Sequence, residues 1–177
     1  AYLLRIERIK AHRLLVLCYN RSAVITLRRR IRRLAGKDCQ GITISTFHSL
    51  AMNFLGISAP DAFSHGTDLG PDAQRQFEEF IPKATALLEG TTEIPGMDKD
   101  QILQSLIGEW SHILIDEYQD IDQQQYAFVS AISGRVRKNP DTKLAILAVG
   151  DDDQNIYEFR GASTRFIHQF EKDYEAE

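Results

Sequence analysis

Three carboxylates and an amide follow a short apolar run in the segment HILIDEYQD, residues 112–120. The run ILI has the composition of a buried strand, and Asp116 and Glu117 come directly after it. Paired carboxylates at the end of a strand can hold Mg²⁺ and orient or deprotonate a water molecule, as in nucleotide hydrolases. An ordinary strand that runs out into solvent has the same pattern. Gln119 and Asp120 favour the interpretation as a site.

A second polar cluster follows a later apolar run, in AVGDDDQNIYEFRGA, residues 148–162. Gly150 permits a tight turn, and three aspartates beginning with Asp151 come next. Gln154 carries an amide that can donate to a phosphate oxygen and accept from water, so it can sense a terminal phosphate. Two aromatic rings and a guanidinium follow, which suit base stacking and phosphate binding, although aromatic pairs are more often buried in a core. These three residues are Tyr157, Phe159 and Arg160.

Strands that alternate with helices must position both clusters. Such alternation indicates an α/β fold with a parallel sheet covered on both faces, and ligands of these sheets gather at the carboxyl ends of the strands. Apolar or β-branched runs predict strands over residues 14–18, 41–46, 112–116 and 143–150. Helical spacing predicts helices over 1–11, from a cap at Ser22 to Gly36, from 47 to Gly56, after a cap at Asp122, and over 163–174.

The composition of the sequence changes between Gly56 and Glu109. Prolines and glycines punctuate this segment, which contains two modest amphipathic helices, near 73–89 and 98–108. We interpret residues 56–109 as a helical insertion. Residues 1–55 and 110–177 are then the two parts of the α/β domain.

Composition limits the class of protein. A chain of 177 residues with 43% hydrophobic content is long enough for one domain with a real core. The longest apolar runs, such as 144–149, are too short to cross a bilayer, and the first residues do not resemble a signal peptide. Two cysteines and five scattered histidines suggest neither a disulfide framework nor a zinc site. We therefore predict a cytoplasmic protein with no membrane partner.

The net charge of −4 conceals an asymmetry along the chain. Residues 1–40 carry eleven Lys and Arg against two Asp and Glu, so the remainder of the chain stands at −13. A basic end beside an acidic body fits a polyanion-binding face next to a cation-dependent phosphate site. A solvated basic helix explains the basic end equally well.

Four segments together carry a resemblance to a known family. ILIDEYQD, VGDDDQNIYEFRGA, ISTFHSLA and VLCYNRSA look like linked motifs of superfamily 1 DNA helicases of the UvrD/Rep type, from residue 14 to about residue 170. DEYQDIDQQQ together with AVGDDDQNIYEFRGA also resembles the UvrD-like part of long bacterial helicases of the RecQ family. The resemblance implies a RecA-like P-loop NTPase domain, ATP and Mg²⁺ as cofactors, and single-stranded DNA and DNA junctions as partners. The insertion 56–109 stands where the family has its accessory subdomain 1B, and it is short for it.

The resemblance also implies roles for individual residues. Asp116 would coordinate Mg²⁺, Glu117 would be the catalytic base of ATP hydrolysis, and Gln154 would sense the γ-phosphate and couple it to DNA. Gln119, Asp120, Gly150 and Asp151 belong to the same motifs. The nucleic-acid-binding residues would be Asn20, Arg21, Thr46, Phe47, His48, Tyr157, Phe159 and Arg160.

The chain departs from the family pattern in two places. The family most often has Trp where Phe159 stands, which leaves a smaller stacking surface. Cys18 and Tyr19 replace a commoner Phe-Thr, so stacking there either shifts to Tyr19 or is lost.

The phosphate-binding pattern G-x-x-x-x-G-K-[ST] does not occur in the sequence. The first eleven residues, AYLLRIERIKA, resemble the helix that follows this loop in the family, so we expect the chain to begin just after it. We expect a second RecA-like domain of the same parent chain to be a partner, and the fragment to be inactive alone. Two alternatives stay open: an ATP-independent DNA-binding or interaction module, and a metal-dependent nuclease that uses Asp116, Asp120 and residues 151–153.

Overall fold

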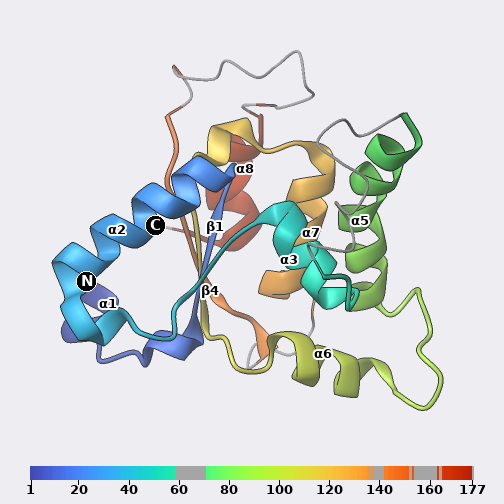
Figure 1. The fold of residues 1–177 in the computed structure, drawn as a ribbon, viewed down its shortest axis with the longest axis horizontal. Helices are drawn as coiled ribbons and strands as arrows, with labels where there is room; N and C mark the ends of the chain where they lie inside the picture. Colours follow the sequence, from blue (N-terminus) through green and yellow to red (C-terminus); the bar gives the residue numbers. More distant parts are fainter. Residues whose placement is uncertain are drawn as a thin grey trace.

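A four-stranded parallel sheet in the order β2-β1-β3-β4 forms the centre of the molecule (Figure 1). The computed structural model describes residues 1–58, 71–135, 137, 142–151, 153, 163 and 165–176, and only the backbone of residues 71–73. The predicted α/β fold with a parallel sheet is confirmed, and each of the four predicted strands is present. The strands are β1 (Leu14–Cys18), β2 (Thr43–Thr46), β3 (His112–Ile115) and β4 (Ala145–Ala148).

The helices connect the strands largely where their spacing predicts them. Asp122 caps its helix as expected, with its side chain accepting from the backbone of Gln125 in a capping box. The helix predicted over residues 1–11 is shorter and ends at Arg5, and the left-handed backbone of Arg8, with φ 54°, prevents a helix from running through to residue 11. The helices are α1 (Tyr2–Arg5), α2 (Arg21–Ala35), α3 (Phe47–Phe54), α5 (Pro71–Glu89), α6 (Lys99–Ile107), α7 (Gln123–Ser133) and α8 (Arg165–Tyr174).

The start of α2 corrects the prediction from the sequence. Asn20, not Ser22, is its cap: the Asn20 Oδ1 atom accepts a hydrogen bond from the Ala23 backbone at 2.8 Å. Asparagine and serine are comparable caps, and Asn20 is the first of the two after β1 with the extended backbone that a cap needs. The helix therefore begins at Arg21.

The two faces of the sheet pack against different helices (Figure 1). On one face, Val16, Cys18 and Ile44 pack against the apolar side of α2. On the other, Leu15 and Leu17 of β1 belong to the main core, which α3, α5, α7 and α8 complete. Strand β1 is thus buried on both faces, as the unbroken apolar run LLVLC predicts. Coverage is not complete at β4, where Leu147 is 52% exposed.

The insertion shares the core of the α/β part. Ile81, Ala84 and Leu88 of α5 and Ile107 of α6 are buried in the main core. Helix α5 packs against α3 and α7, one on each side of the insertion in the sequence. Residues 56–109 are therefore joined to the α/β part through one hydrophobic core. No helix within the described ranges has both the length and the apolar character needed to cross a membrane.

Candidate functional site

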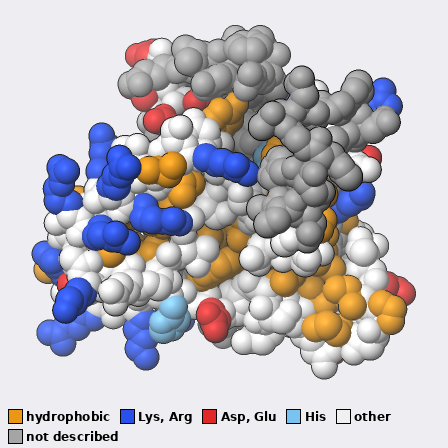
Figure 2. Space-filling view, viewed as in Figure 1, with side chains coloured by type: hydrophobic (Ala, Val, Ile, Leu, Met, Phe, Trp, Pro, Cys, Tyr) orange, Lys and Arg blue, Asp and Glu red, His pale blue; other side chains and the backbone are white. Residues whose placement is uncertain are grey.

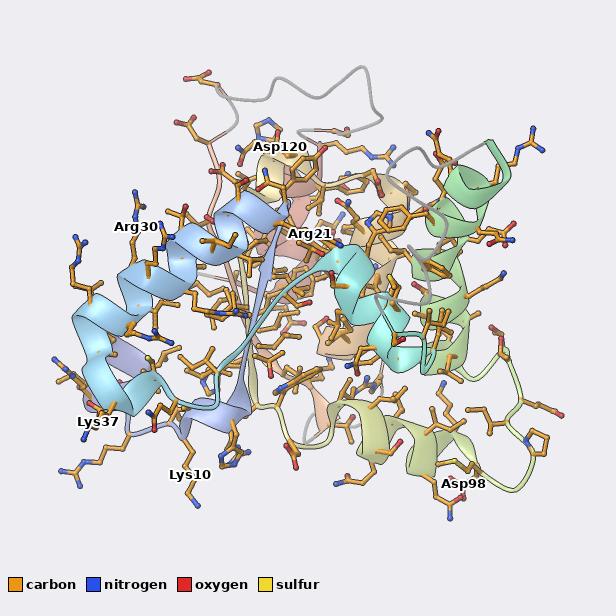
Figure 3. All side chains as sticks on the ribbon, in the orientation of Figure 1. Lys10, Arg21, Arg30, Lys37, Asp98 and Asp120 are labelled. Atoms are coloured by element: carbon orange, nitrogen blue, oxygen red, sulfur yellow. The ribbon has the colours of Figure 1, made fainter. Side chains whose placement is uncertain are left out.

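The polar segments singled out in the sequence meet at one edge of the sheet. Because the four strands are parallel, the loops that follow them emerge on the same side. Figure 3 shows Arg21 and Asp120 at this end of the molecule, whereas Lys37 lies at the far end of α2. Figure 2 shows Lys and Arg side chains gathered over α2, which accounts for the basic amino-terminal part of the sequence.

The chain makes a sharp, strained turn directly after β3. Glu117 has φ 56° and ψ 50°, a left-handed conformation that costs a non-glycine residue about 1–2 kcal/mol. Backbone hydrogen bonds hold the turn from both neighbouring strands. The Asp116 amide donates to the Leu17 carbonyl at 3.0 Å, and the Tyr118 amide donates to the Val149 carbonyl at 2.9 Å. The surrounding sheet thus keeps Glu117 exposed in a backbone conformation that it would rarely adopt by itself.

Gln119 connects this turn to the loop after β4. Its side chain is 1% exposed, its Nε2 atom donates to Glu117 Oε2 at 2.8 Å, and its Oε1 atom accepts from the Asp151 backbone amide at 3.0 Å. Gly150 makes this contact possible, since a Cβ atom there would lie 2.6 Å from Gln119 Oε1. Gly150 is therefore needed for a close approach to Gln119. One buried amide positions the carboxylate of Glu117 relative to the second motif.

Burial and mutual repulsion destabilise the charged carboxylates of the turn. Burial, followed by the charge of Glu117, raises the pKa of Asp116. The same two causes raise the pKa of Asp120, which is 7% exposed and whose Oδ1 atom has no hydrogen-bond partner. A buried carboxylate oxygen without a partner costs free energy that a nearby cation would offset.

The carboxyl ends of β1 and β2 are built differently. Asn20 and Thr46 are the caps of α2 and α3, and Thr46 Oγ1 accepts from the Ser49 amide at 3.2 Å. The ring of Phe47 lies in the main core, 1% exposed, because α3 turns this side toward the sheet. Only the main-chain atoms of Phe47 are therefore placed to contact DNA. His48 is half-buried at the surface.

Two adjoining hollows join the two halves of this edge. The first, about 450 Å³, is lined by Asn20, Arg21, Thr46 and His48, four of the predicted nucleic-acid-binding residues. The second, about 900 Å³, is also lined by Asn20 and His48 and extends to Asp120. The predicted binding residues therefore adjoin the acidic turn along a continuous surface.

The fold agrees with the comparison to known proteins. The family model of the UvrD/REP helicase N-terminal domain matches residues 1–86 and 68–175. The chain belongs to this family. The predicted resemblance to the UvrD/Rep type is thereby confirmed, and the parallel sheet flanked by helices is consistent with the RecA-like domain of these helicases.

Several curated relatives of the chain are named as DNA helicases. The chain is 26% identical to ATP-dependent DNA helicase UvrD1 of Mycobacterium tuberculosis, over 98% of this chain and 31% of the relative. It is also 26% identical to DNA helicase II of Haemophilus influenzae, over 100% of this chain and 32% of the relative. A putative ATP-dependent DNA helicase, YjcD of Bacillus subtilis, is 38% identical over 44% of this chain and 9% of its own length. The chain thus spans about a third of the first two relatives.

The acidic turn of this UvrD/Rep domain fits Mg²⁺. This ion prefers oxygen ligands and is often held by one or two carboxylates together with phosphates and water. Asp116 and Glu117 provide neighbouring carboxylates, and the unpartnered oxygen of Asp120 lies in the same turn. Within the described ranges, no three His, Cys, Asp or Glu side chains approach closely enough to hold a metal by themselves.

Not every predicted site residue can be placed. Gln154, Tyr157, Phe159 and Arg160 lie outside the described residues. Conversely, sequence reasoning missed Phe77 of α5, whose ring stacks on His48. No signal in the sequence pairs these two residues, because their contact depends on how the insertion packs against α3.

Proposed function

We propose that the chain is part of the first motor domain of an ATP-dependent DNA helicase or translocase, which couples ATP hydrolysis to movement on single-stranded DNA and to duplex unwinding. The observation that carries this proposal is the link through Gln119, which joins the Glu117 carboxylate to the loop after β4. In this proposal the turn after β3 and the loop after β4 respond to the same phosphate of ATP. The buried amide of Gln119 couples the two, because it hydrogen-bonds to both. The relatives named as ATP-dependent DNA helicases support the same function.

In this proposal the acidic turn carries out the chemistry. Asp116 would hold Mg²⁺, which when bound would supply neutralisation of the charge that develops on the phosphates of ATP. Glu117 accepts a proton from the attacking water, and its exposed carboxylate is oriented by Gln119. Gln154 reports the γ-phosphate to the DNA-binding side.

The carboxyl ends of β1 and β2 bind the single strand. The hollow of about 450 Å³ is lined by Asn20, Arg21, Thr46 and His48. The other proposed contacts, from the segment after β4, are Tyr157, Phe159 and Arg160. DNA junctions and a second RecA-like domain of the same parent chain complete the set of partners.

The domain boundaries belong to the same proposal. Residues 1–55 and 110–177 form the two parts of domain 1A, and residues 56–109 stand at the position of subdomain 1B. The alignment to UvrD1 spans 240 residues, more than this chain contains, which supports additional residues in the relative within the aligned region. Because the sequence lacks the G-x-x-x-x-G-K-[ST] pattern, we expect the 177-residue chain to be inactive alone.

The test is ATP hydrolysis stimulated by single-stranded DNA, measured on the full-length protein, on its Glu117→Gln variant and on the 177-residue chain. We expect the full-length protein to hydrolyse ATP only with DNA, the variant to lose roughly 100- to 10,000-fold in kcat, and the 177-residue chain to show no hydrolysis. No ATP hydrolysis by the full-length protein would favour the ATP-independent DNA-binding module instead. Hydrolysis retained by the Glu117→Gln variant would show that Glu117 is not the catalytic base.

A further inference from the structure

Helix α5 of the insertion reaches the proposed DNA-binding hollows through one aromatic ring. Phe77 stacks on His48 with a distance of 4.2 Å between the ring centroids and an angle of 6° between the planes. Both rings are half-buried, and both line the 450 Å³ hollow and the 900 Å³ hollow. The stack therefore stands at the junction of the two hollows, where two segments distant in the sequence meet.

The surroundings of the stack suit a flat ligand with polar edges. Tyr19 also lines both hollows, so aromatic rings approach the same space from the residue after β1, from α3 and from α5. Ser49 and Asn53 of α3 supply hydroxyl and amide groups in the smaller hollow. Aromatic side chains beside short polar ones bind a nucleic-acid base through its face and its edge.

Charge separates the path of the phosphates from the position of the base. The larger hollow is lined by Glu78, Asp120 and Asp122, which repel phosphate, whereas Arg21 lines the smaller one. Burial lowers the pKa of His48, against the opposing charges of Asp122 and Glu78, so its ring is neutral at pH 7. A neutral ring stacked on Phe77 offers a base a surface and offers a phosphate little attraction.

We propose that Phe77 and His48 form a stacking wall for one unpaired base of the bound strand, so that the insertion contributes directly to the nucleic-acid site. This inference rests on the proposed function, since it assigns a ligand group to the same surface. Phe80 provides the contrast: it contacts Phe77 edge-on, with ring centroids 6.0 Å apart, packs against the main core, and lines neither of these hollows.

The experiment compares two oligonucleotide probes and four substitutions in the 177-residue chain. The probes are a fluorescent oligothymidylate and an abasic oligonucleotide of the same length, which has the phosphates without the bases. The variants Phe77→Ala and Phe77→Leu remove the aromatic ring, and the second retains apolar packing if the first fails to fold. Phe77→Trp restores a stacking surface, and Phe80→Ala is the matched control on the same helix.

We expect Phe77→Ala and Phe77→Leu to weaken oligothymidylate binding roughly 5- to 150-fold, as the loss of one stacked base does, and to leave abasic binding unchanged. Phe77→Trp should bind oligothymidylate like the unsubstituted 177-residue chain. Phe80→Ala should lower the melting temperature while changing oligothymidylate affinity less than about twofold. Unchanged oligothymidylate binding in both ring-deleting variants overturns the inference alone. If the unsubstituted 177-residue chain binds neither probe, both the proposed DNA site and this inference are overturned.

Discussion

The two halves of the carboxyl edge of the sheet carry polar residues for different purposes. At the ends of β1 and β2, Asn20 and Thr46 satisfy the first amides of the helices that follow, so the same residues stabilise the fold and line the binding hollow. At the ends of β3 and β4, Glu117 is strained and Asp120 is buried with an unpartnered oxygen. In the proposed function, DNA binding falls where the polar groups are hydrogen-bonded, and ATP hydrolysis falls where strain and an unpartnered carboxylate oxygen remain.

This difference predicts opposite effects of substitution. Changes to polar residues on the β1–β2 side should lower stability, whereas removal of strain or charge on the β3–β4 side should raise stability and abolish function. Gly150 is the exception on the second side, since it permits the packing that holds the strained turn.

The largest effect on stability is expected from Gly150→Ala. The added Cβ atom would lie 2.6 Å from Gln119 Oε1 and 3.1 Å from the Gln119 backbone nitrogen, so the loop after β4 must move. We expect a loss of about 2 kcal/mol in the free energy of unfolding, or roughly 4–8 °C in Tm. Thermal unfolding of the chain measures it. In Gly56→Ala, the control, the new Cβ would have no neighbour within 4 Å but the backbone is left-handed at φ 69°, so about 1 kcal/mol is expected. Equal losses in the two variants would contradict the close contact with Gln119.

Asp120→Asn should stabilise the chain at pH 7 by about 1 kcal/mol, because an amide avoids the cost of a buried charge. Since the pKa of Asp120 is raised in the folded state, protonation relieves the same cost in the wild type. The advantage of the variant is therefore full at pH 7 and shrinks as the pH falls through the raised pKa toward the ordinary value of 3.8. Urea unfolding at pH 7 and pH 4 measures the difference, with the exposed Asp100→Asn as control. An advantage that does not depend on pH would argue against the buried charge.

Two substitutions of Asn20 separate its structural role from its binding role. Asn20→Ala removes the cap of α2 and should cost about 1 kcal/mol. Asn20→Asp keeps an equivalent cap oxygen, so stability should be retained, while its negative charge should weaken binding to single-stranded DNA severalfold through repulsion of phosphate. Thermal unfolding and oligonucleotide titration measure both effects. Unweakened DNA binding by Asn20→Asp would place the strand away from this cap.

The smallest expected effect is at Glu117, where the usual order of stability between alanine and glycine variants should be reversed. Glycine normally destabilises relative to alanine, but glycine tolerates the left-handed backbone of this position. Glu117→Gly and Glu117→Ala both delete the hydrogen bond to Gln119, so their difference isolates the backbone strain. We expect the glycine variant to be more stable by about 0.5–1 kcal/mol in chemical denaturation. In the control pair, Arg29→Gly and Arg29→Ala inside α2, the alanine variant should be the more stable. If the alanine variant were also the more stable at Glu117, the turn after β3 would be unstrained.

Periodicity predicted much of this molecule because it depends on neighbours in the sequence. The run LLVLC and the spacing of apolar residues along α2 reflect local burial, and Asp122 caps α7 through its own first turn. The contacts that were missed are not local. Gln119 meets Asp151 across 32 residues, and His48 meets Phe77 only because α5 docks on α3. The prediction of Ser22 as the cap of α2 failed for another reason, since Asn20 stands two residues earlier and is as good a cap by propensity.

The pairing of β1 with β3 also has a kinetic consequence. Leu17 pairs with Ile115, so the central ladder of the sheet closes a loop of roughly a hundred residues. The entropy lost in closing a loop grows with its length, and long-range pairing slows folding. Helix α5 docks on α3, the helix that directly follows β2, and so returns the chain to the first α/β segment ahead of β3 in the sequence. The insertion should therefore act as a folding guide, and shortening or loosening it should delay completion of the sheet before it alters the final structure.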